Sequence, residues 1–222
     1  MTVDVALPAD VVAESRKYRS ENDFESKRSR RFQLIDTPGH AKLRRFAYEA
    51  LGTRTANLTG VIFVVDAADL TSSSGDGSSN GLRESASYLY DVLLELQRQY
   101  TTAKKSKVKE LPLLIAANKM DLFTSLPEHM VKSSLEAEIT RLRTTRSKGI
   151  ASVGRANKGE GLESSIGDEE NDEEGEILGG DPNSKFDFSV MGDYGVNVSL
   201  KGGSVLGDTS VSDWWEWIAS CL

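Results

Sequence analysis

The sequence predicts an α/β domain with a mainly parallel sheet, and three observations support this fold class. Continuous apolar runs of four to six residues recur along the chain, which is typical of strands buried on both faces of a parallel sheet. Between them lie segments whose apolar residues recur at helical spacing. Strand and helix therefore alternate, as in domains whose helices cover a sheet. The chain of 222 residues has a single cysteine, Cys221, which excludes an intramolecular disulfide framework.

Five segments are predicted as strands. Residues 2–7 alternate apolar and polar side chains, like a strand with one buried face. Residues 32–35, 60–65 and 113–117 are continuous apolar runs, so we expect each of these strands to be buried on both faces. Residues 196–201 (VNVSLK) form the predicted last strand.

Four segments are predicted as helices from the spacing of their apolar residues, which repeats every three to four positions at 43–51, 82–96, 131–142 and 211–222. The last of these carries Trp214 and Trp215 on its apolar face. Two tryptophans at this spacing predict a terminal helix anchored on the sheet rather than an aromatic ligand site.

Two segments of low complexity interrupt the predicted elements. Residues 71–81 (TSSSGDGSSNG) are expected to be a flexible loop. Residues 147–184 have no aromatic side chain among their 38 positions, and we expect a disordered acidic insertion there. Nine carboxylates between 160 and 176 account for the formal charge of −7, because the rest of the chain carries +2.

A first candidate site lies in residues 32–40 (FQLIDTPGH), where a predicted strand ends in Asp36. Open α/β sheets bind ligands at the carboxyl ends of their strands. A carboxylate there could hold Mg²⁺ through water, since Mg²⁺ keeps most of its hydration shell. Gly39 has no Cβ to block the approach of a backbone N–H to a terminal phosphate. In isolation, this four-residue pattern also fits an ordinary turn after a strand.

A second candidate site follows the strand at 113–117, in the sequence Asn118-Lys119-Met120-Asp121. The Asp121 carboxylate can accept two hydrogen bonds from the ring N–H and the exocyclic amine of guanine. The Lys119 stem can lie along the base, and the Asn118 amide can connect neighbouring loops. A buried acceptor left unpaired by the wrong base makes such a site selective, so the motif indicates guanine recognition.

Two weaker features lie near these motifs. Ser199 and Lys201, in the last predicted strand, occupy the place where a nucleotide-binding loop would reach the guanine carbonyl, although a plain last strand with a glycine-rich exit fits equally well. His40 follows Gly39 directly, and its neutral imidazole could orient a water molecule. An exposed structural histidine is the alternative, and no other catalytic candidate is identified.

With these motifs in place, the sequence resembles the beta subunit of the signal recognition particle receptor. The resemblance rests on the segment DTPGHAKLR, on the long polar insertion after LEAEITRLRTTRS and before KFDF, and on the closing WWEWIASCL helix. It implies a three-layer G-domain, the fold of the P-loop NTPases. Relatives in the ADP-ribosylation-factor group are the alternative, but they usually lack the insertion and the tryptophan-rich end.

The resemblance also implies a function at the cytosolic face of the endoplasmic reticulum membrane. Members of the family bind GTP with Mg²⁺, pair with the receptor's alpha subunit and act indirectly with the ribosome, the signal recognition particle and the translocation channel. Direct contact with nucleic acid is not expected. By this resemblance Asp36 and Gly39 lie toward the γ-phosphate, while Asn118, Lys119 and Asp121 hold guanine.

One departure from the family pattern is clear in the sequence. A G-domain begins with a buried strand and the loop Gly-x-x-x-x-Gly-Lys-Ser/Thr, whose N–H groups cradle phosphates, and the 222 residues contain no Gly-Lys-Ser or Gly-Lys-Thr. The family's membrane-spanning helix is not found either, because no apolar run approaches 18 residues. We therefore expect residues 1–222 to be a single incomplete G-domain that lacks its first strand and P-loop. Fast GTP hydrolysis is not expected, and a scaffold that binds no nucleotide is the remaining alternative.

Overall fold

The computed structural model describes most of the chain, in residues 1–8, 11, 30–52, 58–71, 80–102, 110–156, 177–181, 184–206 and 211–222. Its centre is a parallel sheet of three strands in the order β3 (Val61–Asp66), β4 (Leu111–Asn118) and β5 (Val196–Gly202). Val61 pairs with Leu113 and Leu111 with Val196, so the three strands end at one edge. The predicted α/β fold with a parallel sheet is confirmed.

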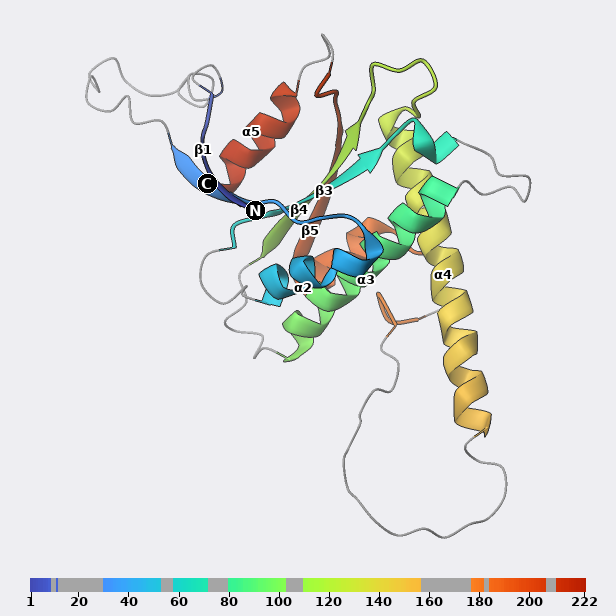
Figure 1. The fold of residues 1–222 in the computed structure, drawn as a ribbon. Helices are drawn as coiled ribbons and strands as arrows, with labels where there is room; N and C mark the ends of the chain where they lie inside the picture. Colours follow the sequence, from blue (N-terminus) through green and yellow to red (C-terminus); the bar gives the residue numbers. More distant parts are fainter. Residues whose placement is uncertain are drawn as a thin grey trace.

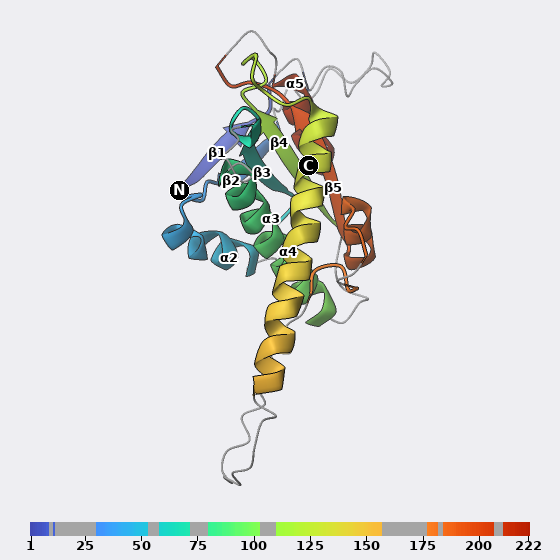
Figure 2. The same cartoon turned by 90° about the vertical axis from the view of Figure 1, so that its right-hand side faces the viewer.

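Helices cover both faces of this sheet (Figures 1 and 2). α3 (Asn80–Thr102) and α4 (Glu128–Ala156) pack against each other on one face, and α5 (Ser212–Cys221) lies on the other. The middle strand, β4, is the most deeply buried element, since its residues from Leu113 to Ala117 are all fully buried. Its continuous apolar run therefore has the burial that the sequence predicts.

α5 is joined to the sheet by few contacts. The Trp214 indole donates a hydrogen bond to the Lys201 carbonyl at 3.1 Å. A Cβ built on Gly60, the residue before β3, would lie 3.0 Å from the Trp217 ring, a tight contact that the glycine avoids. None of the residues of α5 is fully buried. Trp214 contacts the sheet as the sequence predicts, but Trp217, which lies beside Gly60, is not on the predicted face, and Leu222 of that face is 40% exposed.

The first two strands form a separate antiparallel ribbon. β1 (Thr2–Ala6) pairs with β2 (Arg31–Ile35), with Thr2 opposite Ile35. The expectation that residues 32–35 are buried on both faces is wrong, because Leu34 is 41% and Ile35 48% exposed. The physical reason is that β2 pairs with β1 alone and does not join the parallel sheet.

The outer edge of β3 lacks a partner strand among the described residues, because the β1–β2 ribbon does not pair with it. Within the described ranges, β3 pairs with β4 only, and it carries the edge of the three-stranded sheet. Val64 lies in the middle of this apolar strand and is 60% exposed. Its neighbours Phe63 and Val65 point to the other face and are buried, and the Phe63 ring packs against Tyr88 of α3 with centroids 5.3 Å apart.

Short elements complete the fold. η1 (Ala41–Leu43) and α2 (Arg45–Gly52) follow the ribbon, η2 (Asp69–Thr71) follows β3, and η4 (Phe188–Tyr194) precedes β5. Gly195 ends η4 with a φ of 65°, and a Cβ there would lie 2.8 Å from the Tyr100 ring. In the part of the chain that the structure describes, no helix is long and apolar enough to cross a membrane.

The expectation of a disordered insertion over 147–184 is wrong at both of its ends. α4 continues to Ala156, and Leu178 is fully buried beside α3. Gln97 holds this returning segment by donating to the Ile177 carbonyl at 3.1 Å and accepting the Gly179 N–H at 2.8 Å. Most of the insertion, 157–176, lies outside the described residues. So do residues 72–79 of the expected loop at 71–81, whose ends belong to η2 and α3.

Candidate functional site

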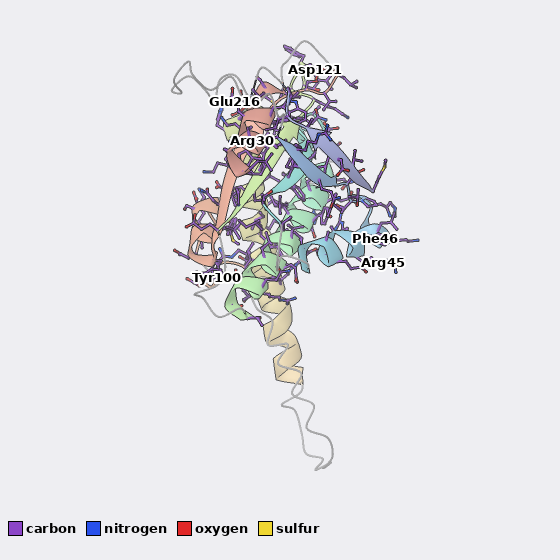
Figure 3. The ribbon with its side chains drawn as sticks, turned by 90° about the vertical axis from the view of Figure 1, so that its left-hand side faces the viewer. Arg30, Arg45, Phe46, Tyr100, Asp121 and Glu216 are labelled. Carbon is purple, nitrogen blue, oxygen red and sulfur yellow. The ribbon has the colours of Figure 1, made fainter. Side chains whose placement is uncertain are left out.

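The polar residues of the second motif gather at the carboxyl edge of the parallel sheet. Asp66, the last residue of β3, pairs in register with Asn118, the last residue of β4. Lys119, Met120 and Asp121 follow Asn118 directly. Figure 3 shows Asp121 at one end of the molecule and Tyr100 toward the other. The alternation of strand and helix brings these side chains together, because parallel strands all end at the same edge.

Asn118 connects two loops. Its Oδ1 atom accepts the Lys119 N–H at 2.8 Å and the Val205 N–H at 3.3 Å. Two backbone hydrogen bonds continue this connection, one from Met120 N–H to the Gly203 carbonyl and one from Gly203 N–H to the Ala117 carbonyl. The Asn118 side chain therefore ties the end of β4 to the loop that follows β5, the structural use that its amide predicts.

Lys119 is held in an unusual conformation. Its φ is 64°, in the left-handed region, and it is the residue other than glycine with a positive φ among those described. Its ammonium lies 2.5 Å from Asp66 Oδ2. This hydrogen bond raises the pKa of Lys119 above its ordinary value. Burial raises the pKa of Asp66, but hydrogen bonds from Lys119 and from the N–H groups of Asp69 and Ala68 outweigh it, so the pKa lies below its ordinary value.

Asp121 is exposed and has no partner within the group. Its carboxylate accepts no hydrogen bond and forms no ion pair with the residues that the structure describes. Both carboxylate oxygens are thus available to an incoming pair of N–H donors. The arrangement fits guanine, whose ring N–H and exocyclic amine lie side by side, better than adenine, which offers no such pair.

The structure places Ser199 and Lys201 before the edge rather than at it. Ser199 pairs with Leu114 in the middle of the sheet, and its buried Oγ has no hydrogen-bond partner among the described residues. The Lys201 ammonium lies 3.8 Å from Asp213 Oδ2 of α5. At the edge itself lie Gly203 and Ser204, which are not among the predicted site residues. The glycine pair before Ser204 is the sequence signal that could have indicated them.

The first motif lies apart from this edge. The Asp36 N–H donates to the Met1 carbonyl at 2.7 Å, and the Met1 ammonium donates to the Asp36 carbonyl at 2.6 Å. In Figure 1 the N mark, which shows Met1, lies well below the arrowheads of β3 and β4. Gly39 has open space where a Cβ would stand. The structure therefore does not bring Asp36 and Gly39 together with the Asn118 loop.

His40 caps the short helix that follows. Its Nδ1 accepts the Lys42 N–H at 3.4 Å at the start of η1, which is a structural use of the side chain. Arg44, another residue that the sequence analysis did not single out, fixes the same loop. Its Nε donates to the Gly39 carbonyl at 3.4 Å, and its guanidinium lies 4.3 Å from the centroid of the Tyr88 ring in α3.

The described residues bring together one part of the predicted nucleotide site. Asn118, Lys119 and Asp121, which we predict to bind the base, lie at the carboxyl edge of the sheet. No group of three or more histidine, cysteine, aspartate or glutamate side chains that could hold a metal ion is found in the described ranges, and Asp36 stands as a single carboxylate.

Comparison with protein families gives one clear match. The model of a family described as the signal recognition particle receptor beta subunit matches residues 5–193. The signal recognition particle receptor subunit beta of Saccharomyces cerevisiae is 33% identical over 122 residues, which are 55% of this chain and 44% of the yeast protein. The chain thus spans less than half the length of this relative.

Two solved structures from Chaetomium thermophilum have the same fold. Receptor SRb with GDP and Mg is 37% identical, covers 85% of this chain and 80% of its own, and superimposes with a TM-score of 0.66. SRb in the SRb-GTP/SRX complex is 33% identical, covers 99% of this chain and 74% of its own, and has a TM-score of 0.65. The three-stranded parallel sheet with its helices is therefore a G-domain fold, as the resemblance implies.

Proposed function

The chain belongs to the signal recognition particle receptor beta subunit family, and from this premise we propose that it is a GTP-binding receptor subunit in co-translational protein targeting. The observation that carries the proposal is the geometry of the base site. Asn118 ties two loops, Lys119 lies fixed between them, and the Asp121 carboxylate is left available at the surface. Three side chains with these roles at the end of one strand fit guanine recognition.

The base site has a defined chemistry. Guanine would donate its ring N–H and amine to the two Asp121 oxygens, and the apolar stem of Lys119 would lie along the face of the base. A base without the amine would cover one Asp121 oxygen and leave it unpaired, and an acceptor that is buried without a partner costs about 1–3 kcal/mol. GTP would bring Mg²⁺ with its phosphates in the assembled receptor. The related SRb structures with GDP-Mg and with GTP support this part of the proposal.

The proposed partner is the receptor alpha subunit. The complex of a related SRb with SRX supports this pairing. We place the protein at the cytosolic face of the endoplasmic reticulum membrane. Through the alpha subunit it would act with the ribosome, the signal recognition particle and the translocation channel. The family assignment favours this role over a trafficking GTPase of the ADP-ribosylation-factor type.

The experiment that tests this proposal is co-expression with the alpha subunit encoded by the same genome. The two chains should co-purify, and guanine nucleotide should be retained in the complex. An Asp121→Asn variant should lose at least tenfold in GTP affinity, because the amide presents a donor where guanine needs an acceptor. Asp193→Asn, an exposed change on η4 before β5, is the matched control and should leave GTP affinity unchanged.

Two results would contradict the proposal. Co-purification without any guanine nucleotide would favour the interaction scaffold. Recovery with vesicle-coat proteins instead of the alpha subunit would favour the trafficking GTPase.

A further inference from the structure

We propose that Asp66 is a positioning residue that keeps Lys119 away from Asp121, so that the Asp121 carboxylate remains open to guanine. This inference rests on the proposed function, because it assigns a role within the same base site. Asp66 lies at the end of β3, outside the Asn-Lys-x-Asp motif, and its sequence neighbourhood gives no sign of this role. Only the pairing of β3 with β4 brings it beside Lys119.

The first step concerns the carboxylates near one ammonium. Three of them act on the charge of Lys119, those of Asp66, Asp69 and Asp121. Lys119 has a flexible stem and an exposed side chain, so its ammonium can form an ion pair with any of the nearby carboxylates. A lysine paired with Asp121 would occupy the acceptor that guanine requires. Guanine binding therefore requires that the Lys119 ammonium pair with a group other than Asp121.

The second step is that the Asp66 carboxylate is already oriented to bind the Lys119 ammonium. Its Oδ1 atom accepts the N–H groups of Ala68 at 3.0 Å and Asp69 at 3.2 Å, which fixes the carboxylate on the turn after β3. Its second oxygen, Oδ2, is then aimed at Lys119 and lies 2.5 Å from the ammonium. A carboxylate already oriented by two backbone donors loses little freedom when it binds a cation, so it outcompetes a freely rotating one.

The third step is that the same ion pair orients the lysine stem. Lys119 is fixed at its backbone by Asn118 Oδ1 and at its tip by Asp66 Oδ2. A side chain held at both ends presents its methylene groups in one position. The stem is thus ready to lie along a planar base without paying further ordering entropy.

The test uses the 222-residue chain and three nucleoside monophosphates that differ at position 2 of the purine. GMP carries an amine there, IMP carries hydrogen and XMP carries oxygen. Affinities are measured by NMR titration, which detects weak binding at a base site. We expect the unchanged chain to prefer GMP, and Asp66→Asn to lower its GMP affinity about tenfold, the effect of losing about 1.4 kcal/mol.

A double-mutant cycle separates the proposed role from a merely structural one. In an Asp121→Asn background the amide can donate to the position-2 oxygen of XMP, and no carboxylate at 121 remains for Lys119 to cover. We expect Asp66→Asn to lower XMP affinity in that background clearly less than it lowers GMP affinity in the unchanged chain, because only the orientation of the Lys119 stem is lost there. An equal loss of GMP affinity in one background and XMP affinity in the other would show that Asp66 only supports the loop, and would overturn the inference.

A readout without nucleotide distinguishes failure of this inference from failure of the proposed function. The ¹⁵N NMR signal of the Lys119 ammonium reports its ion-pair partner. It should shift on Asp66→Asn but not on Asp121→Asn in the unchanged chain, and it should respond to Asp121→Asn once Asp66 is replaced. No response in the second case would overturn the inference. If that response occurs but the chain shows no preference among the three nucleotides, the proposed function fails while the ion-pair exchange stands.

Discussion

The parallel sheet and the β1–β2 ribbon contain the same pair of residues in opposite environments. Leu114 and Ile115 of β4 are fully buried, whereas Leu34 and Ile35 of β2 are 41% and 48% exposed. β4 lies between two strands and beneath helices on both faces, while β2 has one partner strand. Local sequence makes both segments strands. The number of neighbours, which local sequence does not encode, decides how much each contributes to stability.

The ribbon and the parallel sheet also differ in whether they can be stable by themselves. A two-stranded antiparallel ribbon is marginally stable by itself in water, whereas three strands with packed helices can form a stable unit. The ribbon carries Asp36 and the sheet carries Asn118, Lys119 and Asp121. The residues predicted to lie near the phosphates are therefore carried by the less stable ribbon. The residues predicted to bind the base are carried by the more stable parallel sheet.

The largest expected effect comes from truncating the matched isoleucines. Ile115→Ala should lower the free energy of unfolding by about 2–5 kcal/mol, because it leaves a cavity in the core. Ile35→Ala removes the same atoms from a half-exposed position and should cost about 0.5 kcal/mol. Denaturant unfolding of both variants measures the difference. Equal losses would mean that the ribbon is packed as tightly as the sheet.

A buried arginine tests whether the segment returning from the insertion belongs to the sheet unit. Arg143 of α4 is 1% exposed and donates to the carbonyls of Asp181 and Ser184, the latter at 3.0 Å. Arg143→Met should therefore destabilise the protein by about 2–3 kcal/mol, because hydrogen bonds from a charged group are lost. Arg141→Met is the control, since its ion pair at 3.7 Å with Glu138 is exposed on the arginine side and should contribute below about 0.5 kcal/mol.

Hydrogen exchange resolves the two regions within one molecule. Amides of β4 should exchange only through global unfolding, whereas amides of β1 and β2 should exchange through local opening that costs about 1–2 kcal/mol. Mass spectrometry or NMR of the native protein measures both. Protection of the ribbon at the level of β4 would show that the two regions unfold together.

The smallest expected effect on stability lies at the open edge of β3. Val64→Lys places a charge at a position that is 60% exposed, so the free energy of unfolding should change by less than about 0.5 kcal/mol. Charges on an open edge oppose strand pairing between molecules, so self-association should fall. Val205→Lys, an exposed change outside any strand, is the control in sedimentation experiments. A large loss of stability would mean that the edge is covered in solution.

Much of the fold follows from the sequence because the signals are local. Continuous apolar runs predict β3 and β4, the spacing of the apolar residues predicts α3 and α4, and all four are observed. The prediction of disorder over 147–184 fails at its ends because composition cannot foresee distant contacts. Ser147 to Ala156 extend a helix already begun, and Leu178 is buried by α3 residues some 80 positions away in the sequence.

The candidate site also contains residues that the sequence predicts and residues that only the structure reveals. Asn118, Lys119 and Asp121 lie within four consecutive positions, so their chemistry can be inferred from order and residue type. Asp66 and Val205, which hold them, are 52 and 87 positions from Asn118 and could not be recognised without the pairing of strands.

The sequence by itself indicated most of the elements, the family and the residues proposed to bind guanine, because each depends on side-chain chemistry at short spacing. The tertiary structure alone decided that Leu34 and Ile35 are exposed while Leu114 and Ile115 are buried, and that Asp66 holds Lys119. Burial and ion pairing depend on which strands become neighbours. That choice is made by packing across the whole chain, since a strand supplies hydrogen-bond donors and acceptors on both edges without specifying what will meet them.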